Sequence, residues 1–149
     1  EIKHLTNYST HVLNTQLKVT PFLVPHRDEF SETVGYHIQG PKKSALFIPD
    51  IDKWEKDIIT EIYKVDYALL DATFFDSKEV NNRDMLEIPH PFIIESMELL
   101  AKLPASEKQK IHFIHFNHTN PALIPGNEQS KQILDSGFRI SRMLDTFNL

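Results

Sequence analysis

Short apolar runs alternate with longer amphipathic stretches along most of the chain. The apolar runs predict six strands, at residues 17–24, 34–39, 44–48, 66–71, 111–116 and 138–144. Apolar residues at helical spacing predict three helices, at residues 52–64, 91–101 and 128–136. Strands that alternate with helices are typical of an α/β fold, so we expect a mixed sheet with helices on one face.

The ends of the predicted helices carry their own signals. Asp52 is the predicted N-cap of the first helix, with Glu55 three residues later as its capping-box partner. Pro91 suits the first turn of the second helix, and Gly137 suits the end of the third. The polar stretch at residues 76–87 is predicted to be a surface loop, long enough to line a site.

Three predicted strands release a His or an Asp at their carboxyl ends. Their sequences are FLVPHRDE at residues 22–29, ALFIPDID at residues 45–52 and KIHFIHFNHTNP at residues 110–121. Ligands of open α/β folds bind beyond the carboxyl ends of the strands, so we expect these ends to meet at one site. The candidate residues at and around that site are His26, Asp50, Asp71, His90, His115 and His118.

Imidazole and carboxylate groups together indicate a metal site. They suit zinc, iron and manganese, and a carboxylate can bridge two ions. We therefore expect one or two divalent ions, with zinc favoured and iron or manganese as alternatives. Asp71 is expected to support the site rather than to bind the ion. His112, three residues before His115 in a strand, is expected to face the other side of the sheet.

Each candidate residue also has a simpler explanation. His26 could belong to a polar turn, Asp50 to a helix start and His115 to the core. His118 could bond a loop carbonyl, and His90 at a helix start could bind a substrate anion or a leaving group. The metal hypothesis rests on the set as a whole, because its members fall at equivalent ends of successive strands.

Composition narrows the class of protein. The chain has 149 residues, a length typical of one domain. Its formal net charge of -5 argues against a broad phosphate-binding surface, so we expect no nucleic-acid partner. The sequence contains no Cys, which excludes a disulfide framework and a thiolate nucleophile in it. No apolar run reaches the roughly 18 residues of a membrane span, and we expect a cytoplasmic protein without a membrane partner.

Three motifs resemble the metallo-β-lactamase fold superfamily. PHRDEFSETVGYHI at residues 25–38, ALFIPDID and IHFIHFNHTNP are similar to its third, fourth and fifth motifs. LLDATFF and IPHPFIIESMELLAK are similar to segments of its ribonuclease Z-like members. HFNHTNPAL and the later GFRIS resemble the C-terminal signature of the pyrroloquinoline quinone biosynthesis B-like group. The resemblance covers the chain from about residue 19 to its end.

The resemblance assigns roles to five of the candidate residues. It implies that His26, Asp50 and His115 bind the metal, and that His90 and His118 position the substrate or protonate a leaving group. A metal-bound hydroxide would then attack a small-molecule substrate, which makes the protein a metal-dependent hydrolase.

The resemblance also implies that the site in this sequence is incomplete. Residues 1–149 correspond to the C-terminal half of a four-layer αββα sandwich, and the His-x-His-x-Asp-His motif of the N-terminal half is absent. One half alone would expose the inner face of its sheet. We therefore expect a partner, either an N-terminal half or a second copy.

Two other functions are compatible with the same residues. An iron-dependent, oxygenase-type step in pyrroloquinoline quinone biosynthesis would use the same ligands. Alternatively, the chain could be a non-catalytic binding or assembly module, in which case the His and Asp residues would bind no metal.

Overall fold

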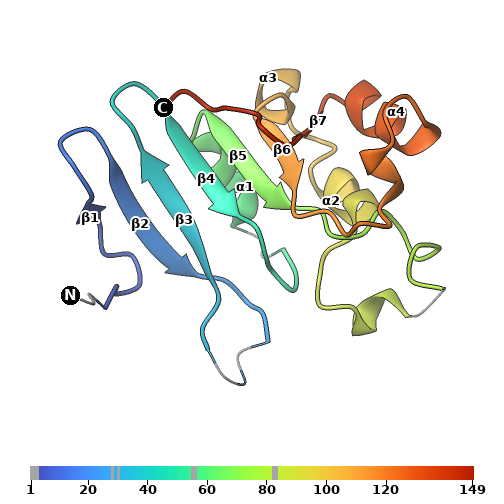
Figure 1. Ribbon diagram of the computed structural model, residues 1–149, viewed down its shortest axis with the longest axis horizontal. Coiled ribbons are helices and arrows are strands. Elements are labelled where there is room, and N and C mark those ends of the chain that lie inside the picture. The colour runs from blue at the N-terminus through green and yellow to red at the C-terminus, as the bar shows by residue number, and fades with distance from the viewer. Residues whose placement is uncertain (1–3, 28, 30, 55–56, 82–83) are drawn as a thin grey trace.

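A single mixed sheet organises the protein (Figure 1). The computed structural model describes residues 4–27, 29, 31–54, 57–81 and 84–149. Within these residues the sheet has seven strands in the order of the sequence. They are β1 (His11–Val12), β2 (Lys18–Leu23), β3 (Val34–Gln39), β4 (Ser44–Ile48), β5 (Tyr67–Asp71), β6 (Ile111–Ile114) and β7 (Arg139–Ile140). The predicted mixed sheet is confirmed, with β1 as an additional short edge strand.

The connections explain why one half of the sheet is antiparallel and the other parallel. Short loops join β1 to β4, and these strands pair antiparallel. From β4 onwards a helical crossover separates successive strands, and β4 to β7 pair parallel. The carboxyl ends of β4, β5 and β6 therefore lie at the same edge of the sheet, where the candidate site was expected.

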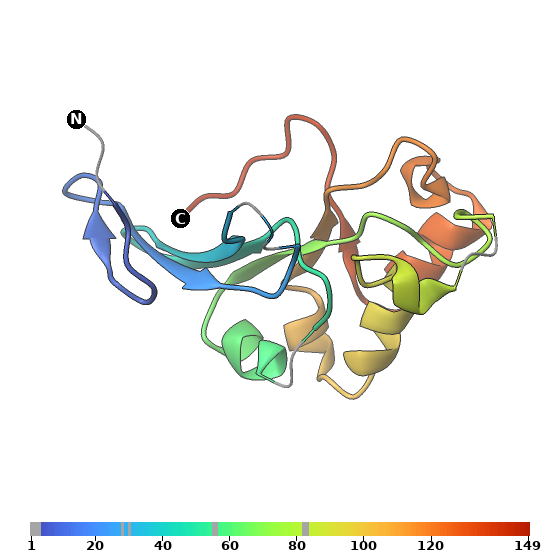
Figure 2. The ribbon, with the colours of Figure 1, turned by 90° about the horizontal axis from the view of Figure 1, so that it is seen from below.

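Helices cover one face of the sheet. They are α1 (Ile58–Tyr63), α2 (Ile93–Leu99), α3 (Ala105–Lys108) and α4 (Glu128–Asp135), with short 3-10 turns at Met85–Glu87 and Pro121–Leu123. Figure 2 shows α1, α2 and α3 on the same side of the sheet. None of the helices described is long and apolar enough to cross a membrane.

The core lies between the sheet and these helices. Alternate positions of β4, β5 and β6 point into it, including Leu46, Leu70 and Phe113, which are fully buried. Ile62 of α1 and Ile133 of α4 close it from the helix side. Burial of each such side chain contributes about 1.5–3 kcal/mol relative to exposure.

The opposite face of the sheet, called here the outer face, has none of the described helices against it (Figure 2). The register places Tyr36, Phe47, Leu69 and His112 side by side across four strands of this face. Their side chains are half-buried. The C-terminal tail, residues 141–149, crosses part of the outer face, and Phe147 packs on His112 and Tyr67 with ring centroids 4.8 and 5.3 Å apart.

Several predicted element bounds were wrong. The first helix begins at Ile58, with Asp57 and not Asp52 as its N-cap, and Glu55 lies outside the described residues. The chain from Pro49 to Trp54 is instead held by buried contacts of Ile51.

Two further bounds differ at later elements. The second helix starts at Ile93, two residues later than Pro91 indicates. It follows an extended Phe92, whose N–H donates a hydrogen bond to the Glu95 carboxylate. The last strand is only Arg139–Ile140, because the chain then turns away over the outer face. Helix α3 was not predicted from the sequence, because its four polar or small residues give no helical pattern.

Candidate metal centre

Four acidic and imidazole side chains meet at the carboxyl edge of the parallel strands. Asp50 follows β4, Asp71 ends β5, His115 follows β6, and His90 lies just before α2. One ligand atom from each of the four lies within 4.8 Å of those from the other three. The convergence of strand ends expected from the sequence thus occurs, because parallel strands release their carboxyl ends at one edge.

Asp71 is the fixed centre of this cluster. Its side chain is fully buried, and its Oδ1 accepts hydrogen bonds from the Thr73 backbone N–H at 3.0 Å and the Thr73 hydroxyl at 2.7 Å. Its Oδ2 accepts from the Ile51 N–H at 3.2 Å and lies 2.8 Å from His90 Nδ1. These donors occupy about all the lone pairs that a carboxylate offers. Asp71 therefore serves to anchor other side chains and has little capacity left for an ion.

The charge of Asp71 is favoured by the same contacts. Burial pushes the pKa of Asp71 upward, but the hydrogen bonds from His115, His90 and Thr73 outweigh that effect and hold the pKa below its ordinary value. The carboxylate is therefore ionised at neutral pH despite its burial. A buried negative charge at this position attracts cations, whether protonated imidazoles or a metal ion.

His115 is oriented by Thr73 and Asp71. Its Nδ1 lies 3.1 Å from the Thr73 hydroxyl and 3.4 Å from Asp71 Oδ1. The hydrogen bond with Asp71 raises the pKa of His115 above its ordinary value, although burial opposes this. With Nδ1 engaged and the side chain 45% exposed, Nε2 is the nitrogen free to bind a ligand.

The backbone of His115 is also unusual. Its φ of 60° lies in the left-handed region, which is costly for a residue other than glycine. The following loop holds it there, since the Asn117 N–H donates to the Thr73 carbonyl at 2.9 Å. The buried Asn120 amide donates to the carbonyls of Ala72 and Thr73 at 3.0 and 3.1 Å.

His90 joins the cluster from the other side. Its Nδ1 lies 2.8 Å from Asp71 Oδ2, 3.2 Å from the Thr73 hydroxyl and 3.5 Å from Asp50 Oδ1. Its ring lies between those of His26 and His115, with centroids 5.6 and 5.9 Å away. The short contact with a buried carboxylate resembles the arrangement that fixes the orientation of a general acid or base.

His26 and Asp50 supply the most direct indication of an ion. His26 Nε2 lies 3.5 Å from Asp50 Oδ1, yet that buried oxygen has no hydrogen-bond partner within the described residues. Two donors that bind one tetrahedral zinc at about 2.1 Å lie roughly 3.4 Å apart. The spacing therefore fits two ligands of one cation better than a hydrogen bond.

The structure brings some predicted residues together and leaves others apart. His118 is exposed in the turn that follows His115, outside the four-residue cluster. His112 contacts Tyr67 and Phe147 on the outer face. Thr73 was not predicted from the sequence. Its position was a usable signal, because an extended chain returns to the same face two residues after Asp71. Asn120 was also missed, since nothing in the sequence marks it as buried.

These donors fit a divalent cation. The set combines the imidazoles of His90 and His115 with an Asp50 oxygen that lacks a hydrogen-bond partner among the described residues, and the buried Asp71 carboxylate lies beside them. The predicted ligand His26 lies outside this four-residue cluster, with its Nε2 3.5 Å from Asp50 Oδ1. Imidazole nitrogen and carboxylate oxygen are the ligands that zinc, iron and manganese share. Thr73 and Asp71 would fix the rings in the way that supporting carboxylates and hydroxyls do in metal sites.

The chain is similar to several known proteins. The family described as "Beta-lactamase superfamily domain" matches residues 1–113 of the chain. Coenzyme PQQ synthesis protein B from Cupriavidus necator is 23% identical over 126 residues, which are 78% of this chain and 40% of that protein. The chain therefore spans less than half the length of this curated relative.

Solved structures share the fold at low sequence identity. The crystal structure of Zn(2+)-bound PqqB from Methylobacterium extorquens superposes with a TM-score of 0.80 and 23% identity, over 99% of this chain and 52% of that one. A diphosphatase from the PhnP family gives a TM-score of 0.61 and 20% identity, over 93% of this chain and 45% of that one. The chain thus matches about half of each of these two structures.

Proposed function

Because this chain belongs to the beta-lactamase superfamily, we propose that it is the metal-binding part of a metal-dependent hydrolase. The observation that carries the proposal is the buried Asp50 oxygen, which has no hydrogen-bond partner in the part of the chain that the structure describes and lies 3.5 Å from a nitrogen of each of His26 and His90. In this proposal, Asp50, His26 and His115 hold a divalent ion, with zinc favoured. Such an ion, when bound, polarises the substrate and makes water nucleophilic near neutral pH.

The residues around the ion would position groups and move protons. Asp71 and Thr73 orient His115 through its Nδ1, which keeps Nε2 directed away from them. Asp71 holds His90 in the same way, so that His90 Nε2 is available to give a proton to a leaving group. His118, exposed beside the cluster, would contact the substrate as it enters.

Metal content tests the ligand assignment directly. The protein is loaded with zinc and dialysed, and bound zinc is measured by mass spectrometry. We expect at least one zinc per chain, and we expect His26→Ala, Asp50→Ala and His115→Ala each to lower the content severely. His4→Ala and Asp135→Ala, at exposed positions away from the cluster, are the matched controls.

An unchanged zinc content in all three variants would leave the non-catalytic module as the better explanation. For catalysis, His90→Ala should retain zinc but lower zinc-dependent hydrolysis of p-nitrophenyl ester or phosphodiester probes by about 100-fold. Loss of zinc together with loss of activity would instead make His90 a ligand.

The second candidate function is an iron-dependent oxygenase-type reaction. Two observations favour it. The curated relative is named for coenzyme PQQ synthesis, and the imidazole and carboxylate donors also suit iron. Consumption of oxygen by the iron-loaded protein, with no hydrolysis by the zinc-loaded protein, would support this function over the first.

We also propose that an N-terminal half of the same fold covers the outer face. The PqqB chain is about twice as long as the region that matches this chain. An N-terminal half of the same fold would therefore be similar in size to this chain. The half-buried Tyr36, Phe47 and Leu69 form a continuous apolar row on the outer face. An apolar face of this kind usually marks an interface.

Light scattering tests this interface. In the absence of the N-terminal half, we expect the chain to self-associate through the outer face, and Phe47→Lys with Leu69→Lys to make it monomeric. Tyr63→Lys, at an exposed position on α1, is the control on the helix side. A monodisperse monomer of the unmodified chain at all concentrations would contradict the proposal.

A further inference from the structure

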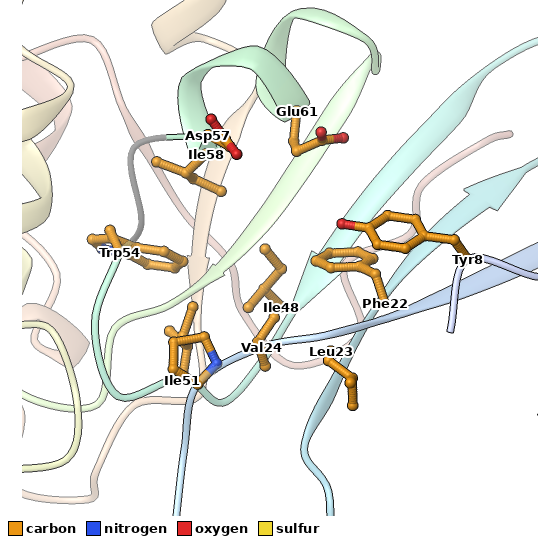
Figure 3. A pocket seen from close by; sticks show the side chains of 11 residues that line it. Tyr8, Phe22, Leu23, Val24, Ile48, Ile51, Trp54, Asp57, Ile58 and Glu61 are labelled. Atoms are coloured by element: carbon orange, nitrogen blue, oxygen red, sulfur yellow. The ribbon is translucent and has the colours of Figure 1, made fainter. Parts of the chain in front are cut away.

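A second concave site lies on the helix side of the sheet, between β2, β4 and α1 (Figure 3). Its cavity volume is about 100 Å³. Apolar side chains form most of its wall, namely those of Phe22, Val24, Ile48, Ile51, Trp54 and Ile58. None of the four clustered metal-site residues lines it. It is therefore a separate site, and the proposed hydrolase function does not involve it.

The mouth of this pocket is acidic. Asp57 and Glu61 are four residues apart on α1, so both carboxylates lie on the same side of that helix, and both line the pocket (Figure 3). Glu61 is fixed by His37 Nε2 at 2.9 Å and Lys64 Nζ at 2.7 Å. Asp57 is exposed.

We propose that this pocket binds a small organic amine with an apolar body, such as an arylalkylamine. The apolar wall would take the body of the ligand, and Asp57 and Glu61 would attract its ammonium group. The volume of about 100 Å³ is smaller than the roughly 150 Å³ of an apolar cavity that holds benzene, so the ring of the ligand would enter the pocket only in part. Trp54 and Phe22 supply aromatic surface for that ring.

Trp54 makes this proposal measurable. It is the single Trp of the sequence, and its indole N–H donates to the buried Ser96 hydroxyl at 2.7 Å. This bond fixes the indole in the wall of the pocket. Occupation of the pocket should therefore change the fluorescence of one residue in a known place.

The experiment is a titration of Trp54 fluorescence with 2-phenylethylamine. EDTA is present throughout, so that the amine cannot bind a metal ion and the result is independent of the proposed hydrolase. The comparison probes are 2-phenylethanol, which lacks the charge, 3-phenylpropionate, which reverses it, and propylamine, which lacks the ring. We expect saturable binding of 2-phenylethylamine, weaker binding of the alcohol and the weakest binding of the other two.

Two conservative variants test the acidic mouth. Asp57→Asn and Glu61→Gln should each weaken binding of 2-phenylethylamine by about three-fold, the scale of an exposed ion pair, and leave binding of 2-phenylethanol unchanged. Asp135→Asn, which removes an exposed acid on α4, controls for the overall charge of -5. An absence of saturation, equal binding of amine and carboxylate, or no effect of both variants would overturn the proposal.

Discussion

At the scale of single residues, the candidate metal centre is organised around the buried carboxylate of Asp71. Asp71 collects hydrogen bonds from the Ile51 N–H and from both donors of Thr73, and it holds two His rings. The neighbouring Asp50 has the opposite character, since its buried oxygen has no hydrogen-bond partner among the described residues. On this contrast we propose Asp71 as an anchor and Asp50 as a ligand, although both are Asp at the ends of adjacent strands.

Asp71→Asn should be strongly destabilising. The substitution replaces one carboxylate oxygen by an NH2 group that faces donors, and we expect a loss of about 3 kcal/mol in the free energy of unfolding. Chemical denaturation at pH 7 measures it, with the exposed Asp135→Asn as the control. A loss below about 1 kcal/mol would mean that the network contributes little.

The same substitution should change the acid sensitivity. The pKa of Asp71 is lowered in the folded state, so its contribution is present above its unfolded pKa of about 3.9 and is lost as the pH falls towards the lower folded value. The variant should therefore lose less stability than the unmodified protein below pH 4. A steeper loss in the variant would contradict the assignment.

The lowered pKa of His37 predicts that folding stability also depends on pH between about pH 7 and pH 5. Burial lowers the pKa of His37 below its ordinary value of 6.5, and the attraction of Glu61 offsets this only in part. As the pH falls below about 6.5, the unfolded chain takes up the proton more readily than the folded one, and stability decreases. His37→Gln should reduce that decrease between pH 7 and pH 5 in thermal denaturation, whereas the exposed His4→Gln should not.

At the scale of elements, the loop after β6 is shaped by one side chain. Asn120 is almost fully buried and bridges this loop to the end of β5, donating to two carbonyls and accepting from the Ala122 N–H at 3.0 Å. These bonds hold the loop in which His115 adopts its left-handed backbone conformation. The sequence HFNHTNP at residues 115–121 therefore combines a candidate site residue, His115, with Asn120, which positions the loop.

Asn120→Ala should affect both stability and metal binding. It leaves the Ala72 carbonyl and the Ala122 N–H without their Asn120 partner, whereas the Thr73 carbonyl keeps the Asn117 N–H. We expect a loss of about 2–4 kcal/mol of folding stability. Zinc affinity should fall as well, because His115 is released from its position. Asn148→Ala, at an exposed position of the tail, is the control. Normal zinc affinity in a folded variant would separate the loop from the site.

At the scale of the whole molecule, the two faces of the sheet differ. The helix face is closed by a continuous core, whereas only the C-terminal tail covers part of the outer face (Figure 2). Phe147 packs on Tyr67 and His112, and Leu149 packs so closely against Gly40 that an added Cβ there would lie 2.4 Å from it. The tail thus shields the end of the outer face that is remote from the metal centre.

Deletion of residues 146–149 should expose this end of the outer face. We expect increased binding of a hydrophobic dye and a shift towards larger species in light scattering, because aromatic surface becomes accessible. The substitution Asp145→Asn, which leaves Phe147 in place, is the control. Unchanged dye binding after the deletion would show that the tail is not bound to this face in solution.

Much of the element order was predictable from the sequence, for local reasons. The runs of β3, β4, β5 and β6 each hold enough apolar residues to require burial, and the alternation of strands with helices favours an α/β fold. That rule also predicted that residues near Asp50, Asp71 and His115 would meet at one edge. The bounds of α1 and α2 were not predictable, because tertiary contacts of Ile51 and Phe92 overrode the local capping signals.

Only the tertiary structure decided which of these carboxylates has its hydrogen bonds satisfied and which lacks a partner among the described residues. The sequence by itself determined that several His and Asp lie at strand ends, since that follows from the pattern of each segment alone. Which carboxylate is satisfied and which lacks a partner depends on donors 2 to 44 residues away, such as Thr73, Ile51 and His115. Hydrogen bonds and burial are properties of the folded neighbourhood, and no single segment contains them.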